Sequence, residues 1–135
     1  MRRLLAIVCL PLSVTALAAC GATTTTAPFS GVRHEAAQAI ANLQSDATAA
    51  EEKKICANDL AATIVRRLGG ASGCEAAIKR QLEGVDNLEV SIQSVDVAAD
   101  GTTATAAVTS IHEGKSRSST VSLVKEGGRW KISGL

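Results

Sequence analysis

The stretch LEVSIQSVDVAADGTTATAAV, residues 88–108, carries the clearest strand pattern in the sequence and decides its fold class. Apolar residues alternate with polar ones over its first five positions, and the alternation resumes one residue out of phase at Val95. This slip predicts a β-bulge near Gln93-Ser94. A bulge adds one residue to a strand and so shifts the side-chain alternation by one position, which lets the apolar residues before and after it lie on the same face. Asp100-Gly101 is a typical hairpin turn, so we expect two antiparallel strands in this stretch.

Two more strands follow this hairpin. Glu113-Gly114-Lys115 is expected to turn the chain, and Val121 and Leu123 mark a third strand by their two-residue spacing. Glu126-Gly127-Gly128 then leads into Arg129-Trp130-Lys131-Ile132, which is expected to be the fourth strand. Consecutive strands joined by short turns predict a four-stranded antiparallel meander.

Helical patterns occupy the sequence before the strands. Apolar residues recur at helical spacing from Val32, in a first helix that we expect to end at Ser45-Asp46. Thr48 and Glu51 have the spacing of a capping box, which predicts the start of a second helix. Asn58-Asp59 is expected to interrupt that second helix.

The second helix is expected to stop at Gly69-Gly70. Ser72 and Glu75 form another capping-box pattern at the start of a third helix, and Gly84 is its expected C-terminal stop. Cys74 shares one stripe of this helix with apolar residues and should face inward. Three helices followed by a meander of strands predict an α+β domain, with the helices packed on one face of the sheet.

This order of elements, closing on Gly-Gly-Arg-Trp-Lys-Ile at residues 127–132, resembles the nuclear transport factor 2-like superfamily, which includes ketosteroid-isomerase-like proteins. More narrowly, it resembles the small bacterial lipoproteins of that superfamily at Cys56, Gly69-Gly70 and Cys74. The resemblance covers residues 32–135. It implies a cone-shaped domain in which a curved sheet wraps around a long helix, with a pocket or a homodimer face on the sheet.

The N-terminal segment has the parts of an export signal. Arg2-Arg3 is a short positive region, and the apolar residues 4–16 are too few to span a bilayer comfortably. The sequence Leu17-Ala18-Ala19-Cys20 resembles the lipobox of bacterial lipoproteins, which implies cleavage before Cys20 and attachment of diacylglyceryl to its sulfur. An ordinary signal sequence with a chance cysteine and an uncleaved anchor are the alternatives.

The resulting organisation is a lipoprotein signal peptide over residues 1–19, a lipidated cysteine with a Thr-rich tether over residues 20–31, and a domain over residues 32–135. The expected location is the extracytoplasmic side of the cell membrane, with the lipid bilayer as partner through acylated Cys20 and palmitate as a typical acyl group. Loss of Arg2-Arg3 from the 14 basic residues leaves 12 against 13 acidic ones. A nucleic-acid partner is excluded, because phosphate binding needs a clustered positive surface.

Cys56 and Cys74 remain as a pair in the exported domain, where an oxidising compartment favours a disulfide between them. A metal site is the first alternative, but His34 and His112 lie at no zinc-like spacing from either cysteine. A catalytic thiol is the second alternative and lacks a motif. We expect a structural disulfide and neither a metal nor a cofactor.

Trp130 is the one large aromatic residue of the predicted domain, and its two-residue spacing from Ile132 predicts that both anchor the core. Trp130 on the rim of an open pocket is the competing prediction.

Residues for acid-base catalysis are few. His34, Asp46 and His112 are the only candidates, and no Tyr is present to stabilise an oxyanion, so no catalytic residue is predicted. The favoured function is a non-enzymatic binding or interaction module, with a pocket lined by Ala, Val, Ile and Leu. An envelope protein, a small apolar ligand and a second copy of the chain are its candidate partners. The alternative is a small envelope enzyme of the isomerase or dehydratase type.

Overall fold

The computed structural model describes residues 24–85 and 88–135. Its elements are α1 (Gly31–Thr48), α2 (Glu52–Lys54), the π-helical turn η1 (Ile55–Asp59), α3 (Ala62–Arg67), α4 (Gly70–Leu82), β1 (Glu89–Val97), β2 (Thr103–His112), β3 (Lys115–Glu126) and β4 (Arg129–Gly134). The strands form one antiparallel sheet in the order β1-β2-β3-β4. The α+β class and the four-stranded meander are therefore confirmed. The predicted signal peptide and Cys20 lie outside the described residues.

The β-bulge lies where the change of phase predicts it. Ile92 pairs with Val108 and Ser94 pairs with Ala107, so Gln93 is the extra residue of β1. Ile92 and Val95 are both buried, because the bulge keeps the apolar residues on either side of it on the same face.

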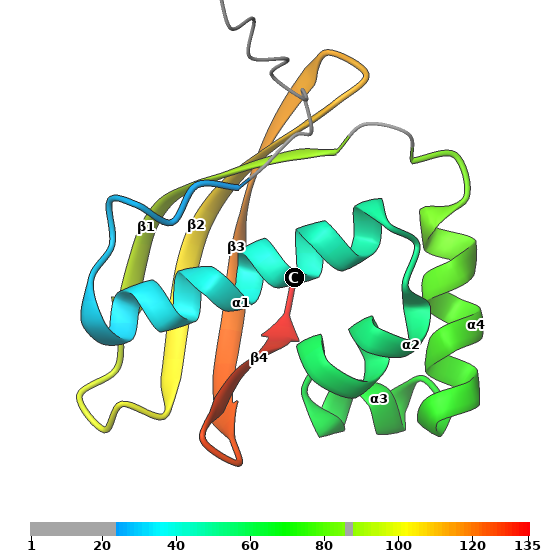
Figure 1. Ribbon diagram of the computed structural model, residues 1–135, viewed down its shortest axis with the longest axis horizontal. Coiled ribbons are helices and arrows are strands. Elements are labelled where there is room, and N and C mark those ends of the chain that lie inside the picture. The colour runs from blue at the N-terminus through cyan, green and yellow to red at the C-terminus, as the bar shows by residue number, and fades with distance from the viewer. Residues whose placement is uncertain (1–23, 86–87) are drawn as a thin grey trace, which may run out of the picture.

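Helix α1 lies across one face of the sheet (Figure 1). The side chains that β2 and β3 direct toward it are buried: Ala104, Ala106, Val108, Val121 and Leu123. The alternate residues of β2, such as Thr103 and Thr105, are exposed on the opposite face. Small alanines on α1, including the buried Ala36 and Ala37, let the helix approach the sheet closely. The core fills the layer between α1 and the sheet and extends from it to η1 and α4, where Ile55, Cys56, Leu60 and Cys74 are also buried.

The predicted boundary between the first two helices is wrong. α1 continues through Ser45-Asp46 to Thr48. The Thr48 hydroxyl donates a hydrogen bond to the carbonyl oxygen of Gln44 at 2.8 Å, so it bonds back into its own helix and caps nothing. Glu51 precedes the short α2 without a side-chain capping bond.

The second predicted helix is interrupted, but at Leu60-Ala61, directly after the predicted Asn58-Asp59, which belong to η1. The structure divides this helix into α2, η1 and α3, so four α-helices replace the predicted three. The cause is a contact with the sheet. Leu60 forms a parallel bridge with Ile132, and the Ala61 N–H donates to the Ile132 carbonyl at 2.8 Å. Backbone bonding to β4 forces extended geometry at Leu60, which separates η1 from α3.

The third predicted helix begins earlier than its capping-box pattern indicates. α4 starts at Gly70, and neither Ser72 nor another side chain caps it. Gly69 precedes it with φ +95, a left-handed conformation that favours glycine. Cys74 is buried, as predicted from its stripe, and forms a disulfide with Cys56 of η1 across a Cα–Cα distance of 6.0 Å. The bond ties α4 to η1.

Candidate functional site

A shallow groove of about 300 Å³ opens between α1, η1 and the start of β4. Its lining residues are His34, Glu35, Gln38, Ala39 and Asn42 of α1, Asn58 and Asp59 of η1, and Gly128, Arg129 and Trp130 of the β3–β4 turn and β4. Most of these residues are polar, so the expected lining of Ala, Val, Ile and Leu is wrong for this groove. The aliphatic side chains are instead buried in the core, where α1 packs against the sheet.

One stripe of α1 supplies the polar wall. His34, Gln38, Asn42 and Asp46 recur every four residues, so they lie on the same side of the helix. The Gln38 amide donates to the Asn42 side-chain oxygen at 3.0 Å. The His34 Nδ1 lies 3.3 Å from the carbonyl oxygen of Thr26.

Two of the three candidate acid-base residues belong to this region. His34 lines the groove, and Asp46 interacts with Asp59 through a side-chain hydrogen bond. His112 does not belong to it, because it ends β2 at the hairpin with β3. Asp59 itself was interpreted from the sequence only as part of a helix interruption. A carboxyl beside a break between two apolar segments was the one signal that could have found it.

Asp59 is the unusual group of the site. Asp59 is only 6% exposed, and this burial is the main reason that its pKa rises from 3.8 to about 7. The negative charge of Asp46 and a hydrogen bond with that carboxyl raise the pKa further, whereas Lys131 and Arg129 lower it. Near neutral pH, Asp59 therefore exists in both protonated and ionised forms.

Trp130 forms the inner wall of the groove. It is 7% exposed and belongs to the core, and its Nε1 has no hydrogen-bond partner among the described residues. The Lys125 ammonium lies 5.6 Å from the centre of its ring and 3.4 Å from a Glu35 carboxylate oxygen. The indole is thus a core residue that also borders the groove. Core anchor and pocket rim are the two positions that the sequence left open as alternatives.

Within residues 24–85 and 88–135, no group of three or more His, Cys, Asp or Glu side chains is placed to hold a metal ion. The same residues include no helix long and apolar enough to cross a membrane. The groove offers amide donors and acceptors, an arginine, and a carboxyl that can hold or release a proton near neutral pH. These groups suit a small polar ligand or a proton transfer.

These features define a small α+β domain in which α1 covers one face of an antiparallel meander, while α4 packs against α2, α3 and η1 rather than on the sheet as predicted. The solution structure of a SEC-C motif-containing protein from Rhodopseudomonas palustris is similar, with a TM-score of 0.58 and 14% identity over 79% of this chain and 80% of that chain. The intermembrane space region of the chloroplast protein ARC6 gives a TM-score of 0.44 and 15% identity over 78% and 95% of the two chains. At such identities the first likeness concerns the fold alone. No family model and no curated protein matches the chain.

Proposed function

We propose that this protein is a cell-envelope lipoprotein, anchored in the membrane through Cys20, whose domain is a non-enzymatic binding module. The observation that carries the proposal is the sequence Leu17-Ala18-Ala19-Cys20 placed directly after a positive region and a short apolar segment. Acylation supplies about 0.8 kcal/mol per buried methylene, so two or more chains anchor a protein stably.

Metabolic labelling with an alkyne fatty acid tests the anchor. The wild-type chain should incorporate the label and sediment with membranes, whereas Cys20→Ala should lose both properties. Cys9→Ala is the matched control, because Cys9 belongs to the segment that is removed and its substitution should leave labelling unchanged. Equal labelling of Cys20→Ala and wild type would refute the anchor.

The binding part of the proposal rests on the polar groove beside Asp59. Asn42 is a lining residue with an exposed side chain, so Asn42→Trp should fill the groove without entering the core. Native mass spectrometry of protein purified from membranes should show a bound small molecule that this variant loses. Thr105→Trp, on the exposed face of the sheet, is the control and should retain the molecule. Retention by Asn42→Trp would contradict the groove as binding site.

A finer assignment of the fold belongs to the same proposal. We place the domain in the nuclear transport factor 2-like superfamily because the bulged meander ends on the strand Arg129–Gly134, which carries the Trp and Ile of the resemblance. A homodimer through the open face of the sheet follows from that resemblance. Sedimentation velocity of wild type and Thr105→Trp measures it: a dimer that the substitution dissociates supports this face, and a monomeric wild type contradicts it.

Asp59 favours one second candidate function, a small isomerase or dehydratase. Its pKa of about 7 suits a general acid or base at neutral pH, and His34 lines the same groove. Such an enzyme should exchange solvent deuterium into the α-carbon of small ketones, observed by proton NMR across a panel. Asp59→Asn should abolish the exchange. Exchange that survives this substitution, or no exchange with wild type, would contradict the enzyme.

A further inference from the structure

The chain joins the domain before the first helix begins. The Thr24 hydroxyl donates a hydrogen bond to the Val90 carbonyl oxygen of β1 at 3.2 Å, and Phe29 packs against the core. If the anchor is Cys20, three residues separate it from Thr24, which makes four Cα–Cα steps. Such a span reaches at most about 14 Å when fully extended. The anchored domain must therefore keep the edge of β1 at Val90 close to the membrane surface.

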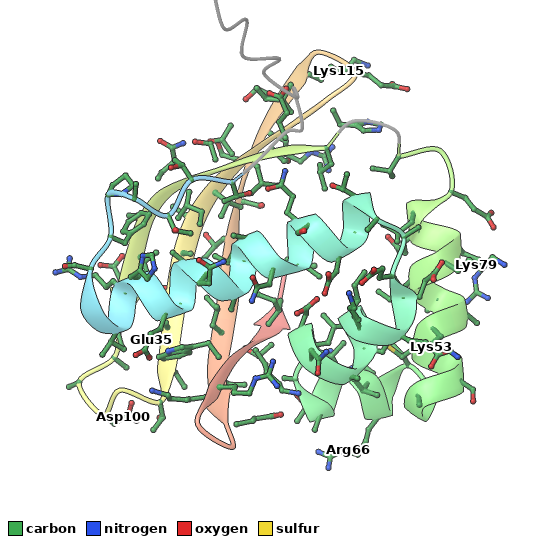
Figure 2. The ribbon with its side chains drawn as sticks, viewed as in Figure 1. Glu35, Lys53, Arg66, Lys79, Asp100 and Lys115 are labelled. Atoms are coloured by element: carbon green, nitrogen blue, oxygen red, sulfur yellow. A yellow bond between two sulfur atoms is a disulfide. The ribbon has the colours of Figure 1, made fainter. Side chains whose placement is uncertain are left out.

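The pairing of the strands shows what else lies at this edge. Val90 pairs with Ser110 of β2, and Ser110 pairs with Arg117 of β3, so these three residues form one row across the sheet. Neighbouring strands are about 4.8 Å apart, which places the Arg117 backbone about 10 Å from that of Val90. Beyond this row the β2–β3 hairpin continues to its turn. Figure 1 shows this hairpin projecting past the rest of the molecule, and Figure 2 shows Lys115 at its tip.

The tip of the hairpin, residues 111–117, is exposed except for the half-buried His112, and it carries two cations. Lys115 and Arg117 are both exposed, and Ile111 is an apolar residue with 41% of its surface accessible. Glu113 is the one carboxylate within the tip, and Glu89 pairs with Ile111 from β1. The two cations make neither a salt bridge nor a side-chain hydrogen bond to any described residue.

We propose that the tip of the β2–β3 hairpin rests on the bilayer and contacts anionic phospholipid headgroups through Lys115 and Arg117. This inference depends on the proposed function, since the acylated Cys20 brings the domain to the membrane. Each cation near an anionic surface strengthens contact by about fivefold, and a short tether raises the effective concentration, so two cations suffice to orient the domain. Figure 2 shows Arg66, of the cationic pair Arg66-Arg67, at the opposite end of the molecule from Lys115, away from the tethered edge.

A probe on the hairpin measures this orientation in the full acylated protein. With Cys56 and Cys74 bonded and Cys20 acylated, Ser116→Cys provides a single reactive thiol for a nitrobenzoxadiazole fluorophore. The matched variant is Ser72→Cys, exposed on α4. In vesicles of phosphatidylcholine and phosphatidylglycerol at 7:3, a headgroup nitroxide lipid should quench the probe at position 116 strongly and the probe at position 72 weakly. Equal quenching of the two probes would overturn the inference.

Charge reversal tests the headgroup contact separately. Lys115→Glu with Arg117→Glu should remove the excess quenching at position 116, while Arg66→Glu with Arg67→Glu should leave it. Pure phosphatidylcholine vesicles should also remove it, and undiminished quenching there would overturn the anionic contact. Vesicle flotation is recorded in every sample. Protein that floats but shows equal quenching refutes the orientation alone, whereas protein that does not float refutes the anchor and the inference together.

Discussion

Replacing Asp59 by Asn should change how the stability of the domain depends on pH. The carboxyl is buried in η1, and the charged groups that act on it are Asp46 of α1, Lys54 of α2, and Arg129 and Lys131 of β4. Burial and Asp46 outweigh the cations, so the folded state favours the protonated form.

The sign and size follow from linkage. The unfolded chain loses the Asp59 proton near pH 3.8, whereas the folded protein keeps it until about pH 7. Between these values the folded state binds more protons than the unfolded state, so the contribution of this group to the free energy of unfolding falls as pH rises. A shift of about three pKa units corresponds to about 4 kcal/mol, lost by pH 8. Asn cannot ionise and avoids this loss.

Urea denaturation of wild type and Asp59→Asn from pH 4 to pH 8, with the disulfide oxidised, measures the effect. The stability of the variant relative to wild type should increase by about 4 kcal/mol across this range. Asp100→Asn is a control of opposite sign: the Thr102 N–H donates to Asp100 Oδ1 at 2.9 Å and lowers the pKa of that carboxyl. The ionised Asp100 carboxylate of wild type therefore stabilises the fold at neutral pH, and this contribution, which Asp100→Asn removes, is lost as pH falls. A difference between Asp59→Asn and wild type that does not vary with pH would refute the buried, protonated carboxyl.

Three further substitutions test the packing. Trp130→Ala should cost about 3–5 kcal/mol, and the native emission of this single indole should be blue-shifted and poorly quenched by acrylamide; red, freely quenched emission would contradict its burial. Replacing Cys56 and Cys74 together by Ser should lower the free energy of unfolding by about 3 kcal/mol, and peptide mapping without reductant should find the linked pair in wild type, not two free thiols. Gly73→Ala should lower the free energy of unfolding by about 1–3 kcal/mol, because a Cβ there would clash with the Leu68 carbonyl oxygen. A urea denaturation curve unchanged from wild type would show that this contact is not tight.

The sheet could be predicted from the sequence because its signals are local. A two-residue period, a single change of phase and the turn Asp100-Gly101 fix the strands and the bulge at Gln93 within a short stretch. The burial of Cys74 follows in the same way from the helical stripe to which it belongs.

The boundaries of the helices and the groove depend on contacts that sequence spacing does not encode. Leu60 leaves helical geometry because it pairs with Ile132, far along the chain. The pattern at Thr48 fits a capping box that starts one helix and a hydroxyl in the last turn of another equally well, and only the continuation of α1 to Thr48 decides between them. Asp59 reaches Asp46 because η1 packs against α1. The raised pKa of Asp59 therefore could not be inferred from the residues that flank Asp59 or Asp46 in the sequence.

The most direct test of the lipoprotein assignment is the intact mass of the protein purified from bacterial membranes. We predict a chain that begins at Cys20 and carries the added mass of a diacylglyceryl group, located on Cys20 by fragmentation. A chain that retains residues 1–19, or one that begins elsewhere without added lipid mass, would contradict the assignment.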